Sequence, residues 1–127
     1  MVKIAVLGYG TVGSGVVEVL TTNRESIARK AGEEIDIKYV LDLRDFPGDP
    51  IQEKIVHDYQ VILDDEEVRV VVEVMGGIEP AFTFVKQALM AGKNVATSNK
   101  ELVARHGAEL IAIARENSVN FMFEASV

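Results

Sequence analysis

The feature that most constrains this chain is a glycine loop directly after its first apolar segment. Residues 3–7 have the sequence KIAVL, which predicts a short buried strand of a parallel sheet. The next six residues, GYGTVG, place Gly8, Gly10 and Gly13 at the spacing G-x-G-x-x-G. Apolar residues then recur at helical spacing from Val12 to Leu20. A strand, this loop and a helix in succession predict a dinucleotide-binding unit, whereas a ligand-free glycine turn is the weaker alternative.

The three glycines have separate tasks in such a loop. Gly8 permits a tight turn, Gly10 lets the backbone approach a pyrophosphate without a Cβ in the way, and Gly13 allows the helix to pack closely on the strand. The free N–H groups at the start of the helix, aided by its dipole, can hold the phosphates. The loop therefore predicts a site for NAD(P).

Strands and helices are predicted to alternate along the rest of the chain. We expect strands at 35–41, 59–63, 68–75, 94–97 and 120–124, helices at 79–91 and 108–117, an irregular loop at 42–54, and a solvated turn or helix start at 64–67. This alternation predicts an α/β fold with a doubly wound, mostly parallel sheet of the Rossmann type. Without repeats or an obvious linker, residues 1–127 are expected to form one dinucleotide-binding domain.

The end of the second predicted strand carries two charges that favour different coenzymes. Asp42 is placed to bind the adenosine ribose of NAD, although it follows Gly13 by 29 positions, more than the usual interval of about 20. The polar segment 21–34 accounts for the excess. Arg44 could instead meet the 2′-phosphate of NADP. A third interpretation makes both residues solvated loop charges, so the coenzyme preference stays open.

Two further segments are expected at the same edge of the sheet. Gly76 and Gly77 follow a strongly apolar strand and would let a dinucleotide pass close to the backbone, unless they form a plain turn. Glu73, within that strand, is expected to face a crevice or a helix N-terminus, because a buried unpaired carboxylate is costly. Residues 97–100, TSNK, leave the next strand. Lys100 could there hold a substrate oxygen or bind coenzyme, or it could be an ordinary solvated lysine.

Composition excludes several classes of partner. The net charge is −7 and no basic cluster is present, which argues against nucleic acid and anionic membranes as partners. The absence of cysteine excludes disulfides and cysteine-based zinc sites, and favours the cytoplasm. No apolar run reaches the length of about 18 residues that a membrane span needs. His57 and His106 lie in polar surroundings and are interpreted as surface residues.

Four segments resemble the N-terminal, nucleotide-binding part of homoserine dehydrogenase. They are VLGYGTVGSGVV at 6–17, VVVEVMGG at 70–77, ATSNKELVARHG at 96–107 and FEASV at 123–127. The resemblance implies the reversible interconversion of aspartate 4-semialdehyde and L-homoserine with NAD(P), in threonine and methionine biosynthesis. From the residues alone, an NAD(P)-dependent oxidoreductase, a dehydrogenase for another small acid or amino aldehyde, and a free-standing NAD(H)-sensing module all stay open.

The resemblance also implies roles for individual residues. Those implied to contact the coenzyme, apart from the glycines and charges above, are Tyr9, Thr11 and Val12 at the pyrophosphate, Met75, Gly76 and Gly77 at the nicotinamide-side ribose, and Thr97 and Ser98 beside the nicotinamide. Lys100 matches a lysine that contacts coenzyme and substrate and is implicated in proton transfer at the reacting oxygen. Glu124 and Val127 match positions that bind a monovalent cation, commonly sodium, partly through main-chain carbonyls.

The family continues beyond the segment that this chain resembles. Its further part is a substrate-binding and dimerising domain with more acidic residues and a second catalytic lysine, and that domain is absent from this chain. We therefore expect an excised or truncated coenzyme domain with little or no turnover by itself. The full-length protein is expected to be a homo-oligomer, and the isolated chain is expected to self-associate through apolar surface near 121–127.

Overall fold

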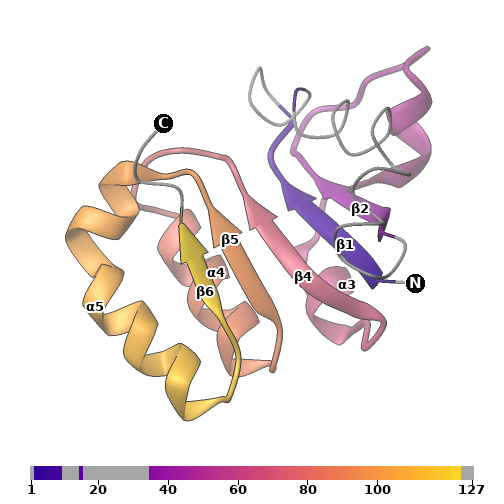
Figure 1. Cartoon of the computed structure of the whole chain (residues 1–127). Helices are drawn as coiled ribbons and strands as arrows, with labels where there is room; N and C mark the ends of the chain where they lie inside the picture. Colours follow the sequence, from indigo (N-terminus) through magenta and orange to yellow (C-terminus); the bar gives the residue numbers. More distant parts are fainter. Residues whose placement is uncertain (1, 10–14, 16–34, 124–127) are drawn as a thin grey trace.

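Six strands form one sheet in the part of the chain that the computed structural model describes, which is residues 2–9, 15 and 35–123. The strands are β1 (Val2–Leu7), β2 (Ile35–Leu41), β3 (Ile55–Val56), β4 (Val68–Glu73), β5 (Asn94–Thr97) and β6 (Phe121–Phe123). Their order in the sheet is β3-β2-β1-β4-β5-β6, and each neighbouring pair is parallel (Figure 1). The doubly wound, parallel fold is thus confirmed. The strand order reverses between β1 and β4, which is where ligands bind in such sheets.

Both faces of the sheet contribute to the core, as expected for parallel strands. The helices of the second half are α3 (Tyr59–Asp64), α4 (Ala81–Met90) and α5 (Lys100–Glu116). Their buried side chains pack with Leu7, Val71 and Val95 in one cluster, and Figure 1 shows α3 and α4 behind the strands. On the opposite face, Val6 packs against Ile51 of a short 3-10 helix, η1 (Pro50–Lys54). The strands therefore alternate their apolar side chains between two buried surfaces.

The predicted strand at 59–63 is wrong, because these residues form α3. The side chain of Asp58 accepts a hydrogen bond from Gln60 N at 3.0 Å and caps the helix. Tyr59 and Ile62, one helical turn apart, are the buried residues of α3. The third strand is instead Ile55–Val56, which pairs with the end of β2. A short apolar segment is compatible with either period, and the capping aspartate decided this one.

Among the other elements in the described ranges, the strands at 35–41 and 94–97 have the predicted bounds. The stretch 42–54, expected to be an irregular loop, contains the 3-10 helix η1, and the helix expected between Val12 and Leu20 lies almost wholly outside the described residues. The predicted helix at 79–91 is α4, and the strand expected at 68–75 ends at Glu73. The helix expected from 108 begins at Lys100, because Asn99 accepts a hydrogen bond from Leu102 N at 3.0 Å and serves as its N-cap. No helix in the described ranges is long and apolar enough to cross a membrane.

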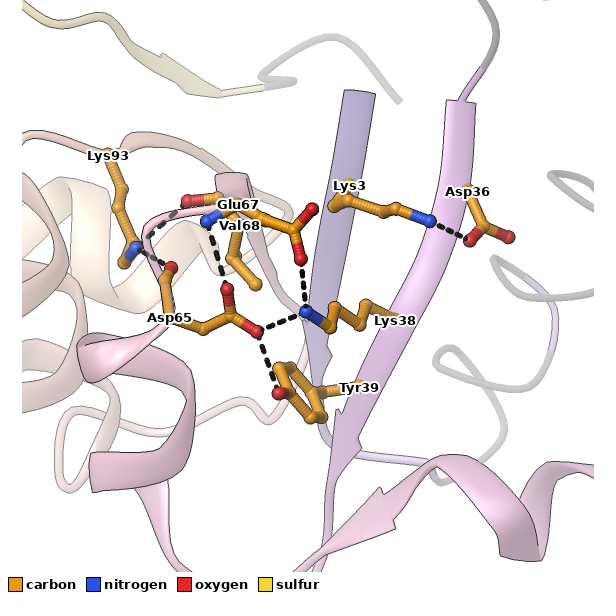
Figure 2. Close-up of polar contacts among 8 residues, drawn as sticks. All are labelled: Lys3, Asp36, Lys38, Tyr39, Asp65, Glu67, Val68 and Lys93. Carbon is orange, nitrogen blue, oxygen red and sulfur yellow. Dashed lines mark hydrogen bonds and ion pairs between the residues drawn. The ribbon is translucent and has the colours of Figure 1, made fainter. Parts of the chain in front are cut away.

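A polar cluster holds the amino-terminal edge of the sheet, opposite the edge where a coenzyme is expected (Figure 2). The carboxylate of Asp65 contacts Lys38 Nζ at 2.5 Å and accepts the Tyr39 hydroxyl at 2.7 Å. Lys93, which is 4% exposed, donates from Nζ to the carbonyls of Asp65 and Val68 at 2.8 and 2.9 Å. These contacts tie the turn before β4 to β2 and to the start of β5.

Candidate functional site

A cavity of about 730 Å³ opens at the carboxyl ends of β1, β2 and β4. It lies at the point where the strand order reverses, which is the expected place for a dinucleotide. Its walls bring together residues that are far apart in the sequence, including five predicted site residues: Gly8, Tyr9, Asp42, Arg44 and Met75. Its volume lies within the range of roughly 300–1,000 Å³ that is usual for ligand pockets.

Gly8 meets two demands that other residues satisfy poorly. Its φ of +100° lies in the region that favours glycine, and a Cβ added there would lie 3.0 Å from Cγ of Met75. Its N–H donates to the carbonyl of Leu41 at 2.8 Å. The first turn of the glycine loop is therefore attached to the end of β2 and packed against the segment after β4. This close packing agrees with the tight turn predicted for Gly8.

Asp42 and Arg44 form an ion pair at the end of β2. The Asp42 carboxylate accepts hydrogen bonds from Tyr9 N, Arg44 N, Arg44 Nε and Arg44 Nη2 at 2.9–3.0 Å. The guanidinium of Arg44 is the largest influence that lowers the pKa of Asp42, from 3.8 to about 2. Burial opposes this shift, while the N–H groups of Arg44 and Tyr9 add to it. Asp42 has its acceptor positions filled, whereas the side chain of Arg44 is 62% exposed.

His57 lies on the wall of this cavity, although sequence reasoning treated it only as a surface residue. Its Nδ1 lies 2.7 Å from the Asp42 carbonyl and its Nε2 lies 2.9 Å from Oδ1 of Asp45. Both partners are acceptors, so both ring nitrogens can donate only when the imidazole is protonated. The carbonyl of Asp42 and, after it, the carboxylate of Asp45 raise the pKa of His57. No spacing in the sequence pointed to these partners.

A second hollow, of about 180 Å³, lies where β5 meets α5. Thr97, Ser98, Asn99 and Lys100 line it together with Phe123 of β6. The site residues that were predicted here are thus neighbours. Lys100 is the first residue of α5 and is exposed, rather than lying at the end of a strand. An ammonium group at this place can donate a proton or a hydrogen bond to a ligand oxygen.

Between these two hollows lies the turn that contains Gly76 and Gly77. Their φ angles are +80° and +73°, and a Cβ on either would meet none of the described atoms within 4 Å. The glycines are therefore needed for backbone conformation, and the turn is open to a ligand. Glu73 lies below the turn with none of its surface exposed, and it accepts hydrogen bonds from Met75 N and Gly76 N at 2.8 and 3.3 Å.

Six predicted site residues lie outside the described part of the chain: Gly10, Thr11, Val12, Gly13, Glu124 and Val127. The described residues contain no group of three or more His, Asp or Glu side chains that could hold a metal ion. The cation site inferred at Glu124 and Val127 therefore stays a prediction.

Comparisons with a family profile, with curated sequences and with solved structures all indicate the same family. A family profile described as "Homoserine dehydrogenase, NAD binding domain" matches residues 8–124. Homoserine dehydrogenase of Lactococcus lactis is 42% identical over 99% of this chain, which covers 31% of that protein. The crystal structure of a homoserine dehydrogenase from Thiobacillus denitrificans has a TM-score of 0.91 at 38% identity, over 99% of this chain and 30% of that one.

A second similar structure includes a coenzyme. It is a hyperthermophilic archaeal homoserine dehydrogenase mutant in complex with NADPH, with a TM-score of 0.78 at 27% identity over 99% of this chain and 44% of that one. The chain spans about a third of the length of the curated relatives that it matches.

Proposed function

Because this chain belongs to the homoserine dehydrogenase NAD-binding domain family, we propose that it binds NAD(P) across the carboxyl edge of its sheet. The observation that carries the proposal is the cavity of about 730 Å³ at the β1/β4 switch point. In the full-length protein, the bound coenzyme would serve the interconversion of aspartate 4-semialdehyde and L-homoserine. The shapes of the Gly8 turn and of the open Gly76–Gly77 turn support a dinucleotide in this place.

Each part of the edge has a separate task in this proposal. The glycine loop, from Gly8 onward, would hold the pyrophosphate, and the turn at 75–77 would adjoin the nicotinamide-side ribose. The nicotinamide supplies or accepts the hydride when the coenzyme is bound, and the protein orients it. Lys100, at the start of α5, would hold a proton at the substrate oxygen and stabilise the negative charge that develops there. Ser98 would adjoin the nicotinamide.

The Asp42–Arg44 pair supports a preference for NADP(H). The acceptor positions of Asp42 are filled by Tyr9 N and by Arg44, so a ribose hydroxyl would have to displace one of these donors. Arg44 is exposed and can turn its guanidinium toward a 2′-phosphate. We therefore expect NADPH to bind more tightly than NADH.

Calorimetric titration of this chain with NADPH and NADH tests the proposal. We expect saturable binding of both, with NADPH favoured. Arg44→Ala should weaken NADPH binding about tenfold, equivalent to about 1.4 kcal/mol, and should change NADH binding by less than about twofold. No saturable binding of either coenzyme would contradict the function, and tighter binding of NADH would contradict only the preference.

The reaction itself is testable in the full-length protein. There, Lys100→Ala should remove nearly all turnover of homoserine while the protein still binds coenzyme. A variant with unchanged turnover would show that another group holds the proton.

Removing sodium from the same assay tests the cation site inferred at Glu124 and Val127. Sedimentation tests self-association, for which the support is two side chains of β6, Met122 and Phe123, that are 46% and 42% exposed.

A further inference from the structure

Glu73 is a carboxylate enclosed in the core, at the carboxyl end of a central strand. It pairs in register with Leu7 of β1 and Thr97 of β5, and none of its surface is exposed. Burial of a charged or strongly polar group is costly unless its hydrogen bonds are satisfied. The hydrogen-bond partners of Glu73 show which elements it connects.

The two oxygens of Glu73 point to different elements. Oε2 accepts hydrogen bonds from Met75 N at 2.8 Å and Gly76 N at 3.3 Å, which lie in the open turn after β4. Oε1 accepts the hydroxyl of Thr97 at 2.5 Å, at the end of β5. One side chain thus holds the turn and the neighbouring strand together.

The hydrogen bonds continue from β5 back to the turn. Oγ1 of Thr97 accepts a hydrogen bond from Asn99 N at 3.0 Å, and Nδ2 of Asn99 donates to the carbonyl of Gly77 at 2.6 Å. Oδ1 of Asn99 caps α5 by accepting from Leu102 N. The side chains of Glu73, Thr97 and Asn99 and the turn 75–77 therefore form a closed ring, here called the Glu73 ring, which also caps the helix that begins with Lys100.

We propose that Glu73 is a positioning residue that sets the coenzyme-side turn 75–77 and the Lys100 end of α5 as one unit. This inference rests on the proposed function, because it takes the turn and Lys100 to be the two sides of the nicotinamide site. A turn with two glycines loses much backbone entropy when it is ordered, so its preformed shape depends on outside contacts. The Glu73 ring provides them from below and leaves the upper surface of the turn open.

The chemistry of the ring favours a carboxylate over an amide. Glu73 has three donors around it, Met75 N, Gly76 N and the Thr97 hydroxyl. An ionised carboxyl only accepts, whereas a glutamine must turn its NH₂ group toward one of them. Glu73→Gln keeps the size of the side chain but leaves one side of the ring broken, which makes it a suitable probe.

Amide hydrogen exchange of the coenzyme-free chain, measured by NMR, tests the ring itself. Glu73→Gln should speed exchange at Leu102 N, which Glu73 does not touch. Thr97→Val should do the same at Met75 N, while Thr97→Ser, which keeps the hydroxyl, should restore protection. The matched control is Lys93→Met, which removes a buried polar contact between the same strands at the opposite edge (Figure 2). It should change these amides no more than the global stability changes.

Titration with NADPH tests the functional part of the inference. Glu73→Gln and Thr97→Val should weaken binding about tenfold, equivalent to about 1.4 kcal/mol and the size of one net hydrogen bond. Lys93→Met should stay within about twofold of the unmodified chain, and Thr97→Ser, which keeps the hydroxyl, should bind more tightly than Thr97→Val. If Glu73→Gln fails to fold, amide exchange at Met75 N in coenzyme-free Thr97→Val carries the comparison, because that readout involves no coenzyme contact.

The outcomes separate this inference from the function on which it rests. If the unmodified chain binds NADPH and both ring variants bind it equally well, the positioning role is refuted and the function stands. If exchange at Leu102 N is unchanged in Glu73→Gln, the turn and the helix are not coupled, whatever the affinities are. If the unmodified chain binds no coenzyme, the proposed function and the positioning role toward it both fail, and the exchange data still show whether the Glu73 ring is a mechanical unit.

Discussion

Replacement of Asp42 by asparagine should destabilise the chain in a way that depends on pH. The carboxylate holds the glycine loop to the end of β2 through Tyr9 N and binds the Arg44 guanidinium twice. Asparagine has nearly the same shape but carries no charge. It also cannot accept at both of its terminal atoms. The structure lets us predict how much of the unfolding free energy is lost because the charge is removed.

The size of that part follows from the pKa of Asp42, which falls from 3.8 to about 2 on folding. Each unit of pKa is equivalent to about 1.4 kcal/mol, so the shift corresponds to about 2 kcal/mol. Asp42 is 9% exposed, but Arg44 is 62% exposed and solvent screens their attraction. We therefore expect about 1–2 kcal/mol at neutral pH.

The lowered pKa of Asp42 determines in which direction the stability difference changes with pH. A carboxyl whose folded pKa lies below its unfolded pKa stabilises the fold fully above the unfolded value, and this contribution disappears as the pH falls through the folded value. The stability difference between the unmodified chain and Asp42→Asn should therefore be constant above about pH 5. It should shrink to about half of its charge-dependent part near pH 3.

Urea unfolding followed by circular dichroism, at several pH values and fixed ionic strength, measures this difference. Asp64→Asn is a matched control, because Asp64 is an exposed carboxylate whose side chain contacts only Gln60 among the described hydrogen bonds. Its effect should stay below about 0.5 kcal/mol. A difference between the unmodified chain and Asp42→Asn that is the same at pH 3 and pH 7 would refute the argument from charge.

Three further changes test other parts of the molecule. Gly8→Ala should lower the free energy of unfolding by about 1–3 kcal/mol and remove coenzyme binding in calorimetry. The reason is that φ of Gly8 is +100° and the new Cβ would lie 3.0 Å from Met75 Cγ. Retained affinity would contradict the role of this turn. Tyr59→Phe should lower the unfolding free energy by about 1 kcal/mol, measured by urea unfolding, because the buried hydroxyl donates to the Phe84 carbonyl at 2.7 Å. An unchanged unfolding free energy would show that this hydrogen bond has no net effect. His57→Gln should destabilise the chain more in mildly acidic than in alkaline buffer. The pKa of His57 is raised on folding, so the protonated imidazole stabilises the fold below the unfolded pKa, and this contribution is lost as the pH rises through the folded pKa. A difference in melting temperature that grows with pH would refute this.

Local sequence was sufficient for the parts of the fold that repeat a strong pattern. The valine-rich run at 68–75 favoured a buried strand, observed as β4, and strands that alternate with helices favour a parallel sheet covered on both faces. Because parallel strands place their carboxyl ends at one edge, the sequence also predicted that Gly8 and Asp42 would lie at the same edge as the turn at Gly76, and the family resemblance added Met75. Apart from Met75, these expectations needed only the order and period of residues along the chain.

Where local patterns were ambiguous, contacts between distant residues decided the structure. Tyr59 joined a helix, not a strand, and its ring packs on Phe84 of α4. Asp42 and Arg44 appeared to be alternatives for the coenzyme, but they bind each other, which no spacing rule indicates.

Glu73 is the clearest case of a role that only the tertiary structure decided. The sequence predicted that this carboxyl faces a crevice or a helix N-terminus, but the structure buries it against the N–H groups of the turn after β4 and the hydroxyl of Thr97. Its partner Thr97 lies 24 positions further along the chain. Sequence periodicity reports which face of an element is buried, because burial depends on nearest neighbours within that element. The partners of a buried polar group come from other elements, so only the packed sheet assigns them.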